Sequence, residues 1–256
     1  MAARSVIFAH GAFCGGWAFE RFRAPFEAKG LRCLAADLRG HAPDAGPGAA
    51  VGVSMADYAA DLAGLAGREP EPPVLVGHSL GGLVALMAAA RAPVRALVLL
   101  APSSPWGIAG GTLEEAISAV SLYGLGAFWT QAIEPDFGAA RAYSLDRMAE
   151  AEQSRVFARM VPESGRALWE TLNWWLDPLM TTAVAPGAVK APVLALVGER
   201  DRVHPPATVA QIAERYGGGM QVMVGMSHWL VGEPGWERVA EVVLGWLDEV
   251  PHRDEE

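Results

Sequence analysis

The chain has 256 residues, of which 52% are hydrophobic and 19% are charged. This composition excludes a disordered or collagen-like chain, and the length suits one or two domains built around a large core. Acidic residues outnumber basic ones by 29 to 20, so the formal net charge is −9. That sign is wrong for a protein that binds the phosphate backbone of nucleic acids, and we expect no nucleic-acid partner.

The apolar segments are too short to cross a membrane. The longest unbroken apolar run, Leu83 to Ala90, has eight residues, far below the roughly 20 that a bilayer span requires. A run near the N-terminus, Val6 to Ala9, is too short for the core of a secretory signal. The two cysteines, Cys14 and Cys33, form neither a disulfide scaffold nor a metal-ligand spacing. These features predict a cytoplasmic protein without membrane association or a structural metal.

Taken in chain order, short apolar runs alternate with segments of helical periodicity. Such runs, without strict polar alternation, are typical of buried parallel strands, and their alternation with helices predicts a doubly wound parallel sheet. Ligands of such sheets bind at the carboxyl ends of the strands. The predicted strands are Val6–Ala9, Leu31–Ala36, Val74–Val76, Val94–Ala101, Val193–Val197 and Met220–Val224. The predicted helices are Trp17–Lys29, Met55–Ala66, Leu80–Arg91, Pro205–Tyr216 and Pro234–Asp248.

One long segment interrupts this alternation. Between residues 103 and 188 no strand run occurs, although helical patterns recur at Leu113–Leu122 and Arg141–Met160. Because an unstructured loop of that length is implausible in a compact domain, we expect a helical cap at 103–188 inserted into a core of residues 1–102 and 189–256. The aromatic side chains of this segment could roof a pocket or fill its own core. They are Trp106, Trp129, Trp169, Trp174 and Trp175.

The strongest chemical signal is the run Gly77-His78-Ser79-Leu80-Gly81, directly after a predicted strand and before a helical run. In a G-x-S-x-G sequence at such a corner, the serine lies on a strained turn that exposes its hydroxyl. The two glycines let strand and helix approach closely. The N–H of Leu80, at the helix N-terminus, can stabilise a developing oxyanion. Ser79 is therefore the candidate nucleophile.

A serine nucleophile requires a base and an acid that orients the base. His228 is the best base, because it lies between the last predicted strand and the last helix, at the carboxyl edge of the sheet. Asp201 follows a predicted strand in the same way, while Asp177 and Glu199 remain alternatives. The order Ser79, Asp201, His228 is that of triads built on this architecture.

The other histidines have weaker positions. His10 ends the first strand, and the side chain of His78, next to the serine, is expected to point elsewhere. His41 and His204 lie in predicted loops with no further signal, and His252 lies in the charged tail. We assign none of them a catalytic role.

The second oxyanion donor is expected in the loop after the first strand, His10 to Trp17, where three glycines let the backbone bend toward the serine. The N–H of Ala12 is our choice, with that of Phe13 as the alternative. A glycine-rich loop here can also bind a dinucleotide, but the spacing is not G-x-G-x-x-G and Trp17 occupies the helix entrance. Cys14 has no activating partner in the sequence, and we interpret it as a packing residue.

With these motifs the chain resembles the α/β-hydrolase family. The resemblance extends over most of the chain, and the segment from His10 to Trp17 is similar to the branch of small esterases and hydroxynitrile lyases. It implies an α/β-hydrolase fold with a helical cap. This chain departs from the family pattern in lacking the usual first hairpin, which leaves an expected sheet of about six mostly parallel strands. The motifs are His10-Gly11 with its glycines and Trp17, Asp37-Leu38-Arg39-Gly40-His41, the Ser79 elbow, Gly198-x-x-Asp201 and Ser227-His228.

The same resemblance implies a cofactor-free serine hydrolase in which Ser79 is acylated, His228 shuttles the proton and Asp201 orients His228. The similar lyases use a lysine near the catalytic histidine, and Trp229 to Glu233 contains none, which favours ester hydrolysis. We predict cleavage of small to medium apolar acyl or aryl esters, or lactones. The alternatives are a thioesterase, a C–C bond hydrolase with the same triad, or a small-molecule receptor. The residues expected to bind substrate are Phe13, Trp106, Trp129, Trp174 and Trp229.

Overall fold

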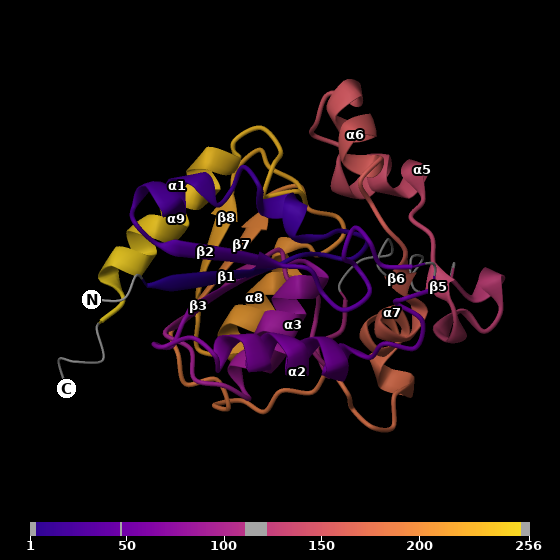
Figure 1. The fold of residues 1–256 in the computed structure, drawn as a ribbon, viewed down its shortest axis with the longest axis horizontal. Coiled ribbons are helices and arrows are strands. Elements are labelled where there is room, and N and C mark those ends of the chain that lie inside the picture. Colours follow the sequence, from indigo (N-terminus) through magenta and orange to yellow (C-terminus); the bar gives the residue numbers. More distant parts are fainter. Residues whose placement is uncertain (1–3, 47, 111–121, 252–256) are drawn as a thin grey trace.

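The computed structural model describes residues 4–46, 48–110 and 122–251. Its centre is a sheet of six parallel strands in the order β2-β1-β3-β4-β7-β8, covered by helices on both faces (Figure 1). Within these ranges no helix is long and apolar enough to cross a bilayer. The strands are β1 (Ser5–Ala9), β2 (Arg32–Ala36), β3 (Val74–His78), β4 (Ala96–Leu100), β7 (Val193–Gly198) and β8 (Gly219–Met223).

Two apolar layers hold the sheet between its helices. Helices α1 and α9 cover one face, and α2, α3 and α8 cover the other (Figure 1). Along β1, Val6 and Phe8 pack in the first layer while Ile7 and Ala9 pack in the second. Because the central strands are buried on both faces, their sequences are continuous apolar runs. The helices are α1 (Ala24–Ala28), α2 (Met55–Ala66), α3 (Leu80–Ala89), α8 (Pro206–Arg215) and α9 (Trp236–Glu249).

The predicted doubly wound parallel sheet is confirmed, and each predicted strand is present with ends shifted by at most two residues. Helix α2 has the predicted bounds because Ser54 and Asp57 form a capping box. Ser54 Oγ accepts from the N–H of Ala56 at 3.1 Å, and the Asp57 carboxylate accepts from the N–H of Ser54 at 2.9 Å. These bonds satisfy donors that a helix start otherwise leaves unpaired.

The predicted single helix over Trp17–Lys29 is wrong. The segment forms a 3₁₀ turn at Gly16–Phe19, a further turn, and then α1. Pro25 lies in the first turn of α1. Because proline has no N–H and crowds the residue before it, a helix begun at Trp17 cannot continue through it.

The predicted helical pattern over Arg141–Met160 is also interrupted. A π-helical turn (Ala140–Ser144) and α6 (Glu150–Phe157) are separated by a non-helical link. In this link Leu145 and Met148 are buried against the core, and the Gln153 amide donates to both of their carbonyl groups. Burial of these two side chains therefore prevails over helical periodicity.

Residues 103–188 are here called the insertion. Its elements β5, β6 and α5–α7 lie beside the carboxyl ends of the central strands (Figure 1). The expectation that this segment contains no strand is wrong, because β5 (Ala132–Ile133) and β6 (Glu163–Ser164) form a short antiparallel pair. Two-residue strands are too short to leave a periodic pattern. Of the helical pattern predicted at Leu113–Leu122, residues 113–121 lie outside the described residues. The other elements are α5 (Phe137–Ala139), α7 (Gly165–Leu172) and 3₁₀ turns at Leu122–Leu125, Phe128–Thr130 and Trp174–Leu176.

The turn from β3 into α3 requires glycine on both sides. A Cβ on Gly77 would lie 2.2 Å from the carbonyl oxygen of Gly81, and a Cβ on Gly81 would lie 2.3 Å from that of Ala9. Both obstacles are backbone atoms, so no side-chain rotation relieves them. Strand β1, strand β3 and helix α3 therefore meet at this corner only because the two residues lack a Cβ.

We predict that Gly77→Ala destabilises the protein by on the order of 3 kcal/mol, because the new methyl group forces the corner apart. Urea denaturation measures this as a lower unfolding midpoint. Gly245→Ala in α9 is the control, since a Cβ there meets no atom within 4 Å and alanine favours a helix by up to about 1 kcal/mol. Equal unfolding midpoints for the two variants would contradict the steric argument.

Candidate active site

Ser79 lies at the carboxyl end of β3 in a backbone conformation that residues other than glycine rarely adopt. Its φ is +55° and its ψ is −123°. The N–H of Ser79 donates to the carbonyl of Leu100 at 2.9 Å, and its own carbonyl accepts from Gly82 and Ser103 at 2.8 and 3.0 Å. These bonds hold the serine in the strained turn that the sequence predicts.

The structure brings Ser79, His228 and Asp201 together from three segments of the chain. His228 Nε2 lies 3.0 Å from Ser79 Oγ, and His228 Nδ1 lies 2.9 Å from Asp201 Oδ2. All three side chains are buried. An imidazole that donates from Nδ1 to the carboxylate presents the lone pair of Nε2 to the hydroxyl. This arrangement allows the imidazole to accept the hydroxyl proton.

The Asp201 carboxylate is held by the backbone that follows it. Its Oδ1 accepts from the N–H groups of Val203 and His204 at 2.8 and 2.9 Å. Burial by itself would raise the pKa of Asp201, but His228, with the nearby His204, holds it below its ordinary value. The carboxyl therefore stays ionised beside the imidazole.

The two alternative acids are engaged elsewhere. The Asp177 carboxylate accepts from the N–H groups of Leu179 and Thr181, and Glu199 accepts from the N–H of Gly225 at 2.9 Å. Each carboxylate fixes its own loop, and the hydrogen-bond partner of His228 Nδ1 is Asp201.

A close backbone contact aligns the Asp201 and His228 loops. A Cβ on Gly198 would lie 2.0 Å from the carbonyl oxygen of Ser227, and the N–H of Arg200 donates to the carbonyl of Met226 at 2.9 Å. The segments after β7 and β8 are thus joined main chain to main chain, which explains why residues 27 positions apart meet.

Two further histidines brace the site in their neutral form. The N–H of Leu38 donates to His10 Nε2, so the ring proton is on Nδ1 and is donated to the carbonyl of Gly11. His78 points away from Ser79 and donates from Nε2 to the carbonyl of His228 at 2.8 Å. Burial, with a second histidine beside each ring, lowers the pKa of both His10 and His78 to about 3.

His41 and His204 carried no sequence signal, yet both are buried next to the site. His204 Nε2 lies 2.9 Å from Ser103 Oγ, and its ring centre lies 5.4 Å from that of His228. His41 Nε2 lies 3.0 Å from a carboxylate oxygen of Glu163 in the insertion. Because these partners are 101 and 122 residues away in the chain, no local pattern could have identified them.

The loop after β1 passes directly beside the serine. A Cβ on Gly11 would lie 3.1 Å from the Cβ of Ser79. Among the hydrogen bonds of residues 4–46, 48–110 and 122–251, the N–H groups of Ala12 and Leu80 have no acceptor. The N–H of Phe13, in contrast, donates to Glu163 Oε2 at 3.3 Å. The segments next to Ser79 therefore carry two N–H groups, those of Ala12 and Leu80, that have no acceptor among the described residues.

The predicted aromatic residues fall into separate groups. The rings of Trp106 and Trp174 are in contact, with centres 5.4 Å apart. Trp174 is half-buried, whereas the following Trp175 is 57% exposed. Trp129 is 39% exposed and lies against Trp169. The insertion therefore presents more than one aromatic surface.

Phe13 and Trp229 belong to the core side of the site. Phe13 packs against an apolar cluster of the insertion that contains Phe128 and Leu168. Trp229 is buried, and its ring contacts His78 at 5.5 Å and Trp17 at 6.2 Å between centres. Trp229 thus packs behind the histidine that supports the His228 loop.

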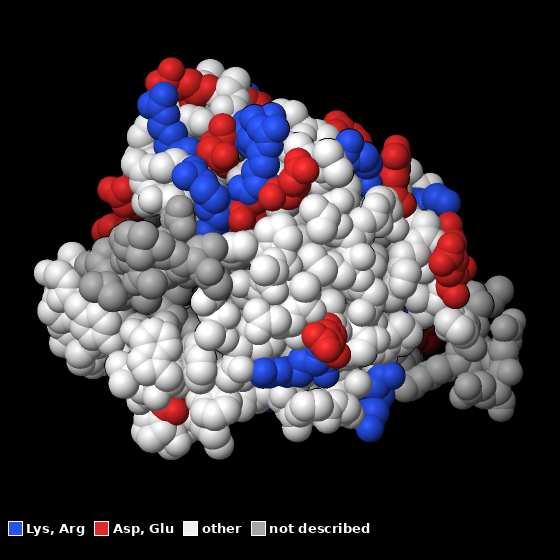
Figure 2. Space-filling view, turned by 180° about the vertical axis from the view of Figure 1, so that it is seen from behind, with Lys and Arg blue, Asp and Glu red and all other residues white. Residues whose placement is uncertain are grey.

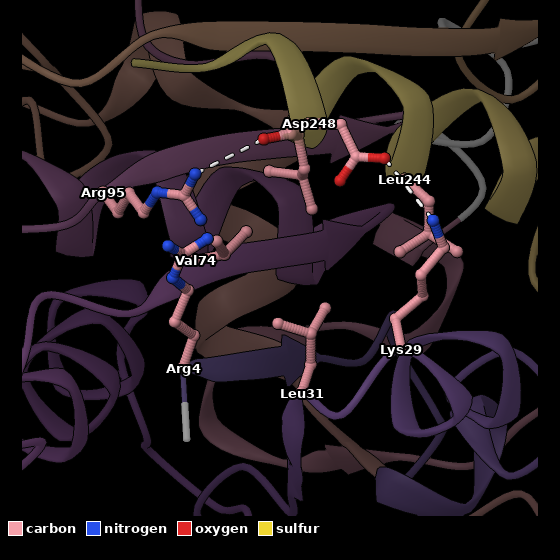
Figure 3. Close-up of a pocket in the computed structure, with 8 residues that line it drawn as sticks. Arg4, Lys29, Leu31, Val74, Arg95, Leu244 and Asp248 are labelled. Carbon is pink, nitrogen blue, oxygen red and sulfur yellow. Dashed lines mark hydrogen bonds and ion pairs between the residues drawn. The ribbon is translucent and has the colours of Figure 1, made fainter. Parts of the chain in front are cut away.

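Two cavities lie apart from the triad. One, of about 160 Å³, opens at the amino-terminal edge of the sheet, where residues that precede the strands line it together with α9 (Figure 3). The other, of about 340 Å³, lies between Trp17, Trp229 and helix α6, where charged side chains gather on the surface (Figure 2). In the described part of the chain, no three His, Cys, Asp or Glu side chains are grouped as metal ligands.

Glu233 is a buried carboxyl group beside the His228 loop. Its Oε1 accepts from the N–H of Ser227 at 2.8 Å, while Oε2 has no hydrogen-bond partner among the described residues. Burial raises the pKa of Glu233 to about 7. The hydrogen bond from the Ser227 N–H lowers this pKa, and the nearby Asp146 raises it further. Its ionised form is therefore disfavoured in the folded protein.

Known proteins are similar to this chain over most of its length. The model of a family described as the alpha/beta hydrolase family covers residues 6–242. Over 96% of this chain and 99% of the other, the fold is similar to that of the methylesterase protein MES16 from Arabidopsis, with a TM-score of 0.72 and 18% identity.

The similar curated sequences match over shorter stretches. A pyrethroid hydrolase of Sphingobium wenxiniae is 37% identical over 82 residues, which are 32% of this chain and 29% of that protein. A probable esterase, PIR7A, of Oryza sativa subsp. indica is 39% identical over 107 residues, or 40% of each chain. The match thus spans less than half the length of these relatives.

The raised pKa of Glu233 predicts a pH-dependent stability. Because the folded pKa is about 7 and that of an unfolded glutamate is about 4.3, the wild-type protein loses stability as the pH rises through this interval. Glu233→Gln keeps an acceptor for Ser227 and removes the charge. We expect the variant to match the wild type at pH 5 and to exceed its stability at pH 8 by on the order of 2 kcal/mol, after allowance for solvent screening.

Urea denaturation at both pH values measures this difference. Glu199→Gln is the matched control, because exposed Glu199 accepts from a backbone N–H of the same segment. Parallel stability curves for Glu233→Gln and the wild type would show that Glu233 does not titrate in this interval.

Proposed function

The chain belongs to the alpha/beta hydrolase family, and on that premise we propose that it is a serine-dependent carboxylic ester hydrolase with an acyl-enzyme on Ser79. The observation that carries the proposal is the continuous line of hydrogen bonds from Asp201 through His228 to Ser79, at 2.9 and 3.0 Å. The proposed substrates are small to medium apolar acyl or aryl esters, or lactones.

In the first half of the proposed reaction, Ser79 Oγ attacks the ester carbonyl carbon while His228 Nε2 takes the hydroxyl proton. The carbonyl oxygen becomes an oxyanion that accepts from the N–H groups of Ala12 and Leu80. When this intermediate collapses, the C–O bond to the alcohol breaks and His228 returns the proton to the departing alcohol oxygen. The acyl group remains as an ester of Ser79.

In the second half, water replaces the serine as nucleophile. His228 takes a proton from the water as it attacks the acyl carbon, and then gives that proton to Ser79 Oγ as the acid is released. Asp201 stabilises the imidazolium present during both transfers and fixes its orientation. No proton passes to Asp201, which its lowered pKa disfavours.

The choice of Ala12 over Phe13 as the second oxyanion donor is supported by hydrogen bonding. The Phe13 N–H already donates to Glu163, whereas the Ala12 N–H has no acceptor among the described groups. A donor that is already paired would have to leave its partner in order to bind the oxyanion, and catalysis favours donors that need no rearrangement.

The paired base and acid favour catalysis over simple binding. A receptor for small molecules needs neither the Nε2 contact to Ser79 nor the Nδ1 contact to Asp201. The names pyrethroid hydrolase and probable esterase belong to similar proteins, and they support a hydrolase here. A thioesterase or a C–C bond hydrolase uses the same triad, so a panel of p-nitrophenyl esters, acyl-CoAs and lactones separates these activities.

We predict that Ser79→Ala lowers kcat by on the order of 10⁴ to 10⁶ and that Asp201→Asn lowers it by about 10⁴, because the three groups act as a unit. Steady-state kinetics on the preferred ester of the panel measures both losses. Asp177→Asn is the control, because the buried Asp177 carboxylate accepts from backbone N–H groups of its own loop and not from His228. We expect this variant to retain kcat within a few-fold. A folded Ser79→Ala variant with wild-type turnover would refute the proposal.

We further predict that the half-buried Trp174, not the exposed Trp175, influences the choice of acyl chain. Trp174→Ala should change the ratio of kcat/KM for long and short acyl esters by roughly 10-fold, as the loss of one apolar contact does. Trp175→Ala is the adjacent control and leaves that ratio unchanged. If Trp174→Ala also preserves the ratio, the ring serves only to pack against Trp106.

A further inference from the structure

Phe13, next to the proposed oxyanion donor, has a backbone that requires external support. Its φ is +64°, a left-handed conformation that is uncommon outside glycine and asparagine. It lies in a tight turn closed by a 3.3 Å hydrogen bond from the N–H of Cys14 to the carbonyl of Gly11. Such a conformation persists only where surrounding groups impose it.

The insertion supplies that support at both peptide groups of Phe13. The N–H of Val161 donates to the carbonyl of Phe13 at 2.9 Å, and the N–H of Phe13 donates to Glu163 Oε2 at 3.3 Å. Because each peptide unit is planar, fixing these two groups fixes the planes on both sides of Phe13. The plane before Phe13 begins at the Cα of Ala12. The Ala12 N–H lies in the adjoining plane, whose Gly11 carbonyl accepts from the N–H of Cys14 at 3.3 Å and from His10 Nδ1 at 2.9 Å.

Glu163 is itself rigidly placed. Its side chain is fully buried and accepts from Tyr58 Oη at 2.7 Å, from the Ser164 N–H at 2.7 Å and from His41 Nε2 at 3.0 Å. Burial by itself would raise the pKa of Glu163, but His41, Tyr58 and the Ser164 N–H together hold it below its ordinary value. A buried carboxylate with every oxygen paired cannot move without losing several charge-assisted bonds.

We propose that Glu163 is a positioning residue for the oxyanion hole: a carboxylate of the insertion that holds the Phe13 turn so that the Ala12 N–H points at the reacting carbonyl oxygen. This inference rests on the proposed function. It assigns to the insertion an indirect part in the chemical step, through the oxyanion hole, in addition to any part in substrate binding.

A second buried carboxylate of the insertion provides a matched comparison. Glu170 accepts from Ser54 Oγ and the Met55 N–H, both at 2.8 Å, and from Arg166 Nε at 2.9 Å. It therefore fastens the insertion to the start of α2 as firmly as Glu163 fastens it to the loops. None of its partners belongs to the Phe13 turn.

The test compares Glu163→Leu, Glu163→Gln and Glu170→Leu in ester hydrolysis and thermal unfolding. We expect Glu163→Leu to lower kcat by about 10- to 100-fold, since misplacing one oxyanion donor forfeits much of its effect, while KM changes less than about threefold. Glu163→Gln, which keeps one acceptor oxygen, should have an intermediate kcat. Glu170→Leu should lower the unfolding temperature similarly but retain kcat within about threefold. Equal losses of kcat for the two leucine variants would overturn the proposal, as would a wild-type kcat in Glu163→Leu.

A second pair of variants covers the case in which Glu163→Leu does not fold. Val161→Pro deletes the N–H that binds Phe13, and the extended backbone that Pro162 favours at this position suits a proline. Val161→Ala keeps the N–H and is its control. We expect a lower kcat in the proline variant alone, and equal kcat values would overturn the proposal.

Labelling with a fluorophosphonate separates this inference from the proposed function. If wild-type Ser79 is labelled and turns over esters while Glu163→Leu is equally active, only the positioning role fails. If the wild-type protein is neither labelled at Ser79 nor active on the panel, the proposed function fails and the positioning role fails with it.

Discussion

The backbones of β1, β3 and α3 meet at distances that no residue with a Cβ permits at positions 77 and 81. This contact turns the chain so sharply that Ser79 takes up a positive φ and projects at the carboxyl edge of the sheet. The same edge receives the ends of β7 and β8, because all six strands are parallel. His228 and Asp201 can therefore reach Ser79 from loops more than 100 residues further along the chain.

The loops at this edge are fixed mainly by hydrogen bonds between buried side chains and the main chain. Leu38 N–H binds His10, Gly16 N–H binds Asp37 at 2.7 Å, and the His228 carbonyl binds His78. Buried polar groups cost several kcal/mol if unpaired, so each of these bonds selects one loop conformation over the alternatives. These bonds keep Ser79 and Phe13 in their strained backbone conformations. The burial of the two hydrophobic layers offsets the free-energy cost of that strain.

The parts of the structure that sequence reasoning predicted correctly are those with a local signature. Apolar runs identified the strands, helical periodicity identified α2, and G-x-S-x-G identified the serine turn. Contacts between distant residues leave no such signature. The partners of His41 and His204, the β5–β6 pair and the role of Gln153 in breaking a helix all depend on which segments the fold brings together.

Two buried glutamates, Glu163 and Glu233, show that the fold, and not the residue type, decides the direction in which the pKa of a carboxyl group shifts. Glu163 is surrounded by donors and its pKa is lowered, whereas Glu233 has one donor, lies near Asp146 and has a raised pKa. In the sequence, no local pattern distinguishes Glu163 from Glu233. Their difference arises because Tyr58 and His41 converge on the first, while the second has one unpaired oxygen.

This contrast indicates what the insertion contributes to the proposed reaction besides covering a pocket. If the insertion served only to cover a pocket, its buried charges would be a cost that apolar residues could avoid. Glu163 is instead a buried carboxylate that accepts from the N–H of Phe13, in a turn whose geometry the proposed chemistry needs. On this proposal the insertion and the loops around Ser79 act as one structural unit, because Val161 and Glu163 of the insertion hydrogen-bond to both peptide groups of Phe13.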